Sequence, residues 1–392
     1  MSPSGNLFLR ETKIEMKHKS AEKAAKWRVL WKTLIGGKKQ GVEVVEIDNG
    51  RMGLRICPTR GMGILSATCD GVRLGWDSPV GEVVHPRFVN LRKKGGTGWL
   101  DGFTELVVRC GLNSIGRPGW DRSLAKNGKR SEFLTLHGRI ANRKARHIRL
   151  SCDSSDKLKL SGVVTESLSP GGVLELATEI STRRNSRSFR IRDAITNRSA
   201  RPVELQVLYH SNIGAPLLAS GARFLAAVDA VAGIDRHAAQ YASTLFTYGP
   251  PSPGFKEQVF LLSLRADRSG RSIVALRSPA GDAAISIEFS IAELPFMTLW
   301  KQTGLAEEMY VTGLEPGTSF PNHRSVERRH GRVMTLSPNT CHYVTLKYTF
   351  HYGVPAVRRL QKRITAIQGN KRPKVLSLRH FYMRQKTLSP GF

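Results

Sequence analysis

The sequence is poor in cysteine, in acidic residues and in long apolar runs. Its five cysteines are scattered and never spaced as Cys-x-x-Cys, so we expect neither a disulfide framework nor a zinc site. No segment approaches the roughly 20 uninterrupted apolar residues of a membrane span. The charged first forty residues also lack the apolar core of a signal peptide. We therefore expect a reduced, cytoplasmic protein that has no membrane segment and no bound metal.

Acidic residues number 31 against 61 lysines and arginines, which gives a formal net charge of +30. Much of the excess lies at the two ends of the chain, and residues 353–392 contain no Asp or Glu at all. Charge that gathers at termini is typical of solvated tails. We expect a basic extension over residues 1–35 and a basic tail over 353–392, the latter dispensable beyond about residue 370. Nucleic acid is expected to make only non-specific, salt-sensitive contacts with these tails.

Helical periodicity is scarce, and we predict helices only for Ser20–Trp31 and Ala356–Ile367. Between them, short strands alternate with turn residues, and Asp48-Asn49-Gly50 is a strong hairpin signal. This pattern is typical of an antiparallel sandwich, so we predict a single all-β domain over residues 36–352. The predicted strands include 41–47, 52–57, 157–164, 173–181, 188–195, 203–209, 259–264, 272–276, 284–289 and 343–350.

Glu315 is the most informative titratable residue. It lies in Gly-Leu-Glu-Pro-Gly, residues 313–317, just after an extended stretch. A carboxylate between glycines and beside a proline is expected on a tight turn and not on a solvated helix face.

Two histidines and an arginine stand in similarly compact surroundings. His137 precedes a glycine, His210 directly follows the strand predicted at 203–209, and Arg60 lies in a glycine-containing turn. Such loops of a β-sandwich usually carry its ligand site. One glutamate and two histidines are the minimum set for moving protons on and off a polyol. Taken singly, each of these residues also has an ordinary structural explanation, as a satisfied histidine or a paired charge.

Several other chemistries are excluded by missing motifs. The chain has no Gly-x-x-x-x-Gly-Lys-Ser/Thr phosphate loop, no Gly-x-Ser-x-Gly nucleophile elbow and no His-Glu-x-x-His zinc motif. The glycine-rich residues 95–119 do not follow the spacing of a dinucleotide-binding fingerprint. We therefore expect no cofactor.

Five motifs occur in a characteristic order between about residues 40 and 350. They are Pro-Thr-Arg-Gly-Met-Gly-Ile (58–64), Arg-Cys-Gly-Leu (109–112), Leu-His-Gly-Arg-Ile (136–140), Tyr-His-Ser-Asn-Ile-Gly (209–214) and Leu-Glu-Pro (314–316). Together they resemble the aldose 1-epimerase-like family of unknown function, a branch of the galactose mutarotase-like superfamily. The resemblance implies a large twisted β-supersandwich with a sugar site on one concave sheet face.

The resemblance also implies roles for individual residues. Glu315 matches the catalytic base, His210 the general acid, and His137 the histidine on the ring-oxygen side of the sugar. Asn212, in the same motif as His210, is expected to contact the substrate. Arg60 is the better candidate for the sugar-binding arginine, and the alternatives are Arg109 and Arg117. The aspartate that binds sugar hydroxyls has two candidates, Asp229 and Asp235.

These roles predict an isomerase that interconverts the anomers of a sugar by acid–base ring opening. Trp99, Trp120 and Trp300 are candidates to stack on an apolar sugar face, although such residues more often belong to a core. Two alternatives remain open. One is a non-catalytic carbohydrate-binding or sensing protein on the same fold. The other is a polysaccharide lyase, for which Tyr209 is a candidate group at the cleaved bond.

Overall fold

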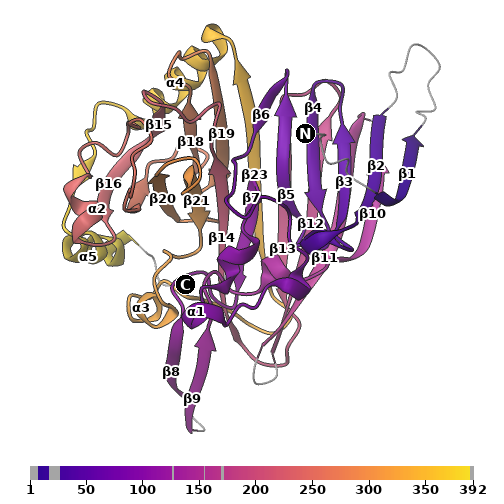
Figure 1. The fold of residues 1–392 in the computed structure, drawn as a ribbon. Coiled ribbons are helices and arrows are strands. Elements are labelled where there is room, and N and C mark those ends of the chain that lie inside the picture. The colour runs from indigo at the N-terminus through magenta and orange to yellow at the C-terminus, as the bar shows by residue number, and fades with distance from the viewer. Residues whose placement is uncertain (1–7, 17–26, 126–127, 154, 169–171, 389–392) are drawn as a thin grey trace.

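The computed structural model describes residues 8–16, 27–125, 128–153, 155–168 and 172–388. In this part of the chain, two large and mainly antiparallel sheets pack face to face, and a separate two-stranded hairpin projects from one end (Figure 1). The prediction of an all-β antiparallel sandwich with few helices is confirmed.

The larger sheet has 14 strands. Two of them lie off its main path, because β6 (Val72–Leu74) pairs only with β5 and β22 (Met334–Leu336) only with β14. The path joins segments that are far apart in the sequence at its centre. In spatial order, it consists of β1 (Phe8–Met16), β2 (Trp27–Leu34), β3 (Glu43–Asp48), β4 (Met52–Cys57), β5 (Gly63–Cys69), β7 (Val107–Leu112), β14 (Val203–Ile213), β21 (Tyr310–Gly317), β20 (Phe296–Thr303), β17 (Gln258–Leu264), β16 (Val228–Gly233) and β24 (Lys374–Val375).

The smaller sheet has eight strands, and the projecting hairpin has two. In spatial order, the smaller sheet consists of β10 (Arg146–Cys152), β11 (Lys157–Leu168), β12 (Gly172–Arg183), β13 (Ser188–Asn197), β23 (Cys341–Tyr352), β19 (Ala283–Ser290), β18 (Arg271–Arg277) and β15 (Arg223–Ala226). The hairpin consists of β8 (Gly119–Ala125) and β9 (Gly128–Leu134).

The helices are few and mostly short. The α-helices are α1 (Lys93–Gly96), α2 (Arg236–Gln240), α3 (Arg324–Arg329), α4 (Val354–Gln368) and α5 (Leu378–Leu388). The 3-10 helices are η1 (Gly37–Lys39), η2 (Pro86–Phe88), η3 (Gly98–Gly102) and η4 (Ile140–Asn142). No helix in the described part of the chain is both long enough and apolar enough to cross a membrane.

The main core lies between the sheets because successive side chains of each strand point to opposite faces. In β13, Phe189, Ile191 and Ile195 are buried in this core, and Leu205 and Val207 of β14 meet it from the larger sheet. The outer face of β14 carries a second, smaller apolar cluster instead, which contains Leu208 and the loop residues Trp99 and Phe103. The central strands of the larger sheet are therefore buried on both faces.

The strand predictions hold throughout the sandwich. Each predicted strand overlaps an observed one, and the hairpin signal at residues 48–50 joins β3 to β4. The helix predicted at Ala356–Ile367 is confirmed as α4. The helix predicted at Ser20–Trp31 is wrong from Trp27 onward, because β2 pairs there with β3. The beginning of that prediction, residues 20–26, lies outside the described residues.

The C-terminal segment is part of the packed structure, contrary to the expectation of a dispensable tail beyond about residue 370. Strand β24 extends the larger sheet by pairing with β16. Phe381 and Tyr382 of α5 are buried in an apolar cluster with Phe296 and Phe320. The basic composition was misleading because long charged side chains remain in water while the other face of a short helix packs.

Candidate functional site

His210 and Glu315 face each other on β14 and β21, the central strands of the larger sheet. The residue pairs on either side of them share one register, which places the two directly opposite each other. The ladder is interrupted here, and Pro316 has no N–H to contribute. His210 Nε2 lies 3.1 Å from Glu315 Oε1. An imidazole and a carboxyl group therefore meet at a break in the sheet.

The sequence around Glu315 suggested a tight turn, but Glu315 does not lie on one. It belongs to strand β21, where it pairs with Thr298 of β20. Glycine and proline are common in turns that are exposed to solvent. Here the segment is β21, and its pairing with β14 and β20 on either side keeps it extended. The correction matters because a strand residue has a fixed direction, and Glu315 points to the same face as His210.

Gly313 is the glycine of this motif that the site requires. A Cβ atom there would lie 2.3 Å from Glu315 Oε1, 3.1 Å from His210 Cε1 and 3.2 Å from a ring carbon of Trp300. Any side chain would displace the carboxyl group. The sequence indicated this glycine only as a turn former.

Aromatic rings enclose the pair. Their centroids lie 5.1 Å (Phe103), 5.4 Å (Trp300), 5.4 Å (His137) and 6.2 Å (Trp99) from that of His210. His210 is 4% exposed and Glu315 is 2% exposed. Both groups are therefore shielded from solvent, which strengthens any electrostatic interaction between them.

Burial opposes the charged form of both groups. The pKa of Glu315 is raised well above its ordinary value by burial and then by the nearby carboxylate of Glu257. The pKa of His210 is lowered well below its ordinary value by burial and then by His137. Burial therefore favours a protonated carboxyl group and a neutral imidazole.

Asn212 fixes the tautomer of His210. Asn212 Nδ2 donates to the backbone oxygen of Glu105 at 2.9 Å, so its Oδ1 is directed at His210 Nδ1, 2.6 Å away. An amide oxygen can only accept, so Nδ1 carries the hydrogen and Nε2 presents a lone pair to Glu315. Asn212 therefore positions the histidine, and its expected contact with a substrate stays a prediction.

His137 lies beside His210 on the segment that follows the hairpin. Its backbone has a left-handed φ of 55°, and its Nδ1 lies 2.7 Å from the backbone oxygen of Ile115. A carbonyl oxygen only accepts, so His137 Nδ1–H donates and Nε2 remains for a ligand. Burial lowers the pKa of His137 to about 4, which keeps the ring neutral.

Arg60 is fully buried and bonded to protein groups through Nε and Nη1. Its Nε donates to Glu105 at 2.6 Å, and its Nη1 donates to the backbone oxygen of Val84 and to Asn142 Oδ1. Glu105 also receives the bond from Asn212 through its backbone. Arg60 therefore supports the segment before β7 that holds the His210 tautomer, and its expected contact with a sugar stays a prediction.

Arg109 lies on the opposite face of the larger sheet from His210. Its guanidinium group forms two bonds to Asp193, at 2.5 and 3.0 Å, and one to Thr178 at 2.7 Å. Both partners belong to the smaller sheet, so this ion pair joins the two sheets through the core. Its alternative, Arg117, is exposed. The position of Arg109 between the sheets does not support the expectation that it binds substrate, which stays a prediction.

The two candidate aspartates have structural partners. Asp229 pairs with Arg265 and Arg384, and Asp235 caps α2 by accepting from the backbone of Ala238. The carboxylate near the pair is instead Glu257, whose Oε2 accepts from Trp300 Nε1 at 2.9 Å. Glu257 lies in the loop before β17, and nothing in the sequence of that loop indicates a site residue. Its place near the pair becomes clear only from its hydrogen bond with Trp300 on the neighbouring strand β20.

Several solved structures are similar to this chain. A galactose mutarotase-like protein from Clostridium acetobutylicum is 16% identical, with a TM-score of 0.55, and the match covers 81% of this chain and 97% of that one. A galactose 1-epimerase from Lactobacillus acidophilus NCFM is 12% identical, with a TM-score of 0.55, over 88% and 99% of the two chains. At these identities the likeness shows the fold alone, which is the galactose mutarotase-like sandwich.

The family is shown by two further matches. A model described as a domain of unknown function (DUF4432) matches residues 39–350. A structure from Klebsiella pneumoniae subsp. pneumoniae MGH 78578, provisionally named an aldose 1-epimerase, is 34% identical with a TM-score of 0.85, and 94% of each chain is covered. The chain belongs to the DUF4432 family, and the resemblance to aldose 1-epimerase-like proteins is confirmed. Among curated proteins, none matches the chain.

Proposed function

We propose that this protein is an aldose 1-epimerase-like isomerase that interconverts sugar anomers at the His210–Glu315 pair. The observation that carries the proposal is the 3.1 Å approach of His210 Nε2 to Glu315 Oε1 in an aromatic enclosure. The Klebsiella relative, by its provisional name, supports the same reaction class.

Anomeric exchange needs a base at the anomeric hydroxyl and an acid at the ring oxygen, two atoms that are both bonded to the anomeric carbon. The base removes the proton of the anomeric hydroxyl while the acid protonates the ring oxygen. The ring opens, the C1–C2 bond rotates, and closure reverses both transfers. The catalyst therefore returns to its original protonation state after each turnover.

The pair holds one proton that both residues can carry. At rest the proton lies on Glu315, for the reasons of burial given above. Transfer of this proton to His210 Nε2 gives a carboxylate base and an imidazolium acid without changing the net charge. Substrate hydroxyls that bind the carboxylate favour that transfer, because hydrogen bonds stabilise the charged form.

Polar atoms around the pair support the binding of hydroxyl groups. Trp99 Nε1 and Thr298 Oγ1 are buried and have no hydrogen-bond partner among the described residues. Such atoms are costly unless a ligand satisfies them. The partly exposed rings nearest the pair are His137 and Trp300, so a sugar would enter between them.

The test is anomeric exchange measured by NMR or polarimetry across a panel of aldoses. Glu315→Gln keeps the shape of the side chain but cannot exchange a proton, so the rate should fall about 10²–10⁴-fold. Glu307→Gln, a change at an exposed carboxylate, is the matched control. An unchanged rate in Glu315→Gln would show that Glu315 is not the base.

A non-catalytic sugar-binding protein is the second candidate. The near-complete burial of both groups favours it, because a rigid enclosure of this kind restricts the movement that ring opening needs. Calorimetric binding of a sugar without exchange above the uncatalysed rate would establish this function in place of the first.

A further inference from the structure

His137 is held by the loop of residues 113–116, which follows β7. The ring Nδ1–H donates to the backbone oxygen of Ile115 at 2.7 Å, and the backbone N–H of His137 donates to the oxygen of Gly116 at 3.3 Å. Which ring nitrogen carries the hydrogen is set by the hydrogen bond that the ring makes. The position of this loop therefore determines both the direction and the tautomer of the His137 ring.

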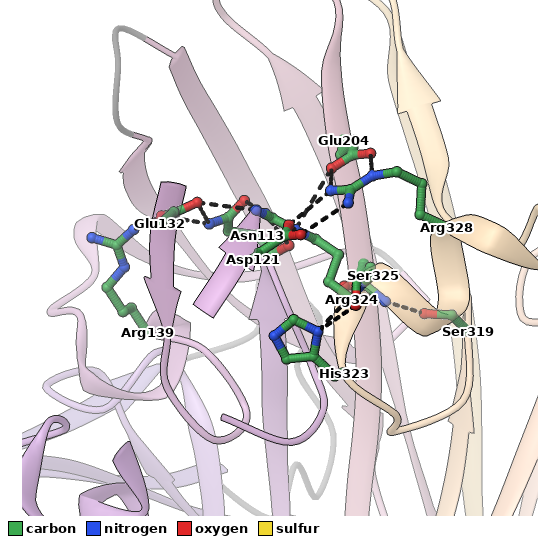
Figure 2. A network of polar contacts seen from close by, with 11 residues as sticks. Asn113, Asp121, Glu132, Arg139, Glu204, Ser319, His323, Arg324, Ser325 and Arg328 are labelled. Carbon is green, nitrogen blue, oxygen red and sulfur yellow. Dashed lines mark hydrogen bonds and ion pairs between the residues drawn. The ribbon is translucent and has the colours of Figure 1, made fainter. Parts of the chain in front are cut away.

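Arg324 of α3 anchors the loop at its beginning (Figure 2). Its side chain is buried, and Nη1 donates to both oxygens of Asn113, the side-chain Oδ1 and the backbone oxygen, the latter at 3.3 Å. At the end of the loop, the backbone oxygen of Asn322 packs so closely against Gly116 that a Cβ atom there would lie 1.8 Å from it. The start of α3 and the segment before it therefore fix both ends of the loop.

Glu132 of the β8–β9 hairpin forms a second link between α3 and His137. Arg324 Nη2 donates to Glu132 Oε2 at 3.1 Å, and Arg139 Nη2 donates to Oε1 at 3.3 Å. Asn113 Nδ2 donates to both oxygens of this carboxylate, at 3.0 and 3.1 Å. Arg139 follows His137 closely in the chain. One carboxylate thus joins the loop that orients the ring to the segment that carries it (Figure 2).

The segment before α3 also connects this network to the His210–Glu315 pair. It is continuous with β21, the strand of Glu315. It is bonded to β14, the strand of His210, because Thr318 Oγ1 accepts from the backbone N–H of Val207 at 2.9 Å. The contacts of α3 with the loop therefore relate the position of the His137 ring to that of the pair.

We propose that Arg324 is a positioning residue that holds the His137 ring in the tautomer whose Nε2 is free for the substrate. Its planar guanidinium group donates in three directions, through Nη1 to Asn113, through Nη2 to Glu132 and through Nε to Asp121 at 2.6 Å. A lysine has the same charge but cannot reproduce this fork. The effect on anomeric exchange rests on the proposed function, whereas the state of the His137 ring can be measured without it.

Arg328 offers a matched comparison on the same helix. It forms two bonds to Glu204, at 2.6 and 2.7 Å, and two to Asp121, at 3.0 and 2.8 Å (Figure 2). None of its bonds within the described part of the chain reaches the 113–116 loop. Arg328 therefore ties α3 to the hairpin and to β14 without touching the loop that orients His137.

NMR of the histidine ring nitrogens tests the positioning role, with His137→Asn used to assign the His137 signals. In the unchanged protein at neutral pH, Nδ1 should be protonated and Nε2 unprotonated. In Arg324→Lys, the ring should lose this single state and show both tautomers. Arg328→Lys is the control and should keep the single tautomer, although both variants should lower the urea midpoint of unfolding.

A milder pair of variants decides the question even if Arg324→Lys does not fold. Glu132→Gln keeps the shape of the side chain but has one acceptor oxygen in place of two, so it cannot accept from all three of its present donors. Glu204→Gln is the control, because this carboxylate is bonded to Arg328 and not to the loop. Both tautomers of His137 should appear in Glu132→Gln, and only one in Glu204→Gln.

Anomeric exchange gives a second readout. Arg324→Lys should slow it about tenfold, because the substrate loses an oriented hydrogen bond, and Arg328→Lys should stay within about twofold of the unchanged protein. If the unchanged protein shows no exchange, the proposed function fails, and the NMR comparison still tests the positioning role.

Two outcomes would overturn the positioning role. One is a single, unchanged His137 tautomer in both Arg324→Lys and Glu132→Gln. The other is an equal change in the controls Arg328→Lys and Glu204→Gln, which would show that the ring responds to a general loosening of the hairpin.

Discussion

Tyr209 and His210 are neighbours in β14, yet they face two buried environments that treat ionisable groups differently. Tyr209 points between the sheets, where its hydroxyl donates to Asp193 at 2.7 Å. Asp193 also accepts two bonds from Arg109. His210 points to the outer face, where its Nε2 lies 3.1 Å from Glu315 Oε1.

Buried ionisable groups have a structural role between the sheets and a chemical role on the outer face of the larger sheet. Between the sheets, the opposite charges of Arg109 and Asp193 compensate each other, and hydrogen bonds satisfy the rest. On the outer face, burial drives Glu315 and His210 toward their neutral forms, so a proton can move between them. We expect changes on the inner face to affect stability and changes on the outer face to affect chemistry.

The largest expected effect is at Asp193. Asp193→Ala leaves the Arg109 guanidinium buried without its carboxylate, so the free energy of unfolding should fall by about 3–5 kcal/mol. Urea denaturation measures it. The double change Arg109→Met with Asp193→Leu should recover much of the loss, because no charge is then left unpaired. A loss below about 1 kcal/mol in the single variant would refute the structural role.

The second largest effect is expected at Asn212, which fixes the tautomer of His210 on the outer face of the larger sheet. Asn212→Leu leaves His210 Nδ1–H without its acceptor, so anomeric exchange should slow about 10- to 100-fold. Asn212→Asp should restore the bond and raise the pKa of His210, which NMR titration detects, because a carboxylate stabilises the imidazolium. If Asn212→Leu keeps the full rate, the tautomer is fixed by some other contact.

A third test uses pH. Because the folded-state pKa of His137 is about 4 and the ordinary value is 6.5, the unfolded chain binds the proton first as the pH falls. The stability that neutral His137 contributes is present above pH 6.5 and is lost between about 6.5 and 4. His137→Asn should remove about 3 kcal/mol of this acid dependence, measured by denaturation at several pH values.

The control for that test is His147→Asn. Both histidines have a left-handed φ, 55° at His137 and 52° at His147, which asparagine tolerates well. His147 is exposed, so its replacement should leave the pH dependence as it is. If the free energy of unfolding depends on pH equally in the two variants, burial of His137 does not set the acid sensitivity.

The smallest effect is expected at Tyr209. Tyr209→Phe removes one bond to Asp193 and should lower the free energy of unfolding by about 1–2 kcal/mol. Anomeric exchange should stay within about twofold, because the ring points away from His210 on the other face of the strand. A large loss of exchange with little loss of stability would show that the two faces are coupled through β14.

The sequence alone predicted the strands well because alternation of apolar residues and turn chemistry are local properties. Residues 48–50 specify a hairpin wherever they occur between two strands, and the observed pairing of β3 with β4 follows. The ordered motifs also identified His137, His210 and Glu315, which the fold brings together. The same local signals misplaced Glu315 on a turn and Trp27 in a helix, because cross-strand partners outweigh local propensity.

Only the tertiary structure decided which buried groups are structural and which are available for chemistry. Arg109 and His210 both lie in conspicuous motifs, but the pairing of β7 with β14 puts them on opposite faces of one sheet. Arg109 then meets Asp193 of the smaller sheet, and His210 meets Glu315 of β21. A sequence fixes the order and local shape of its strands. The face and partner of each side chain depend on pairing between residues about a hundred positions apart, and that pairing is set by the packing of the whole sandwich.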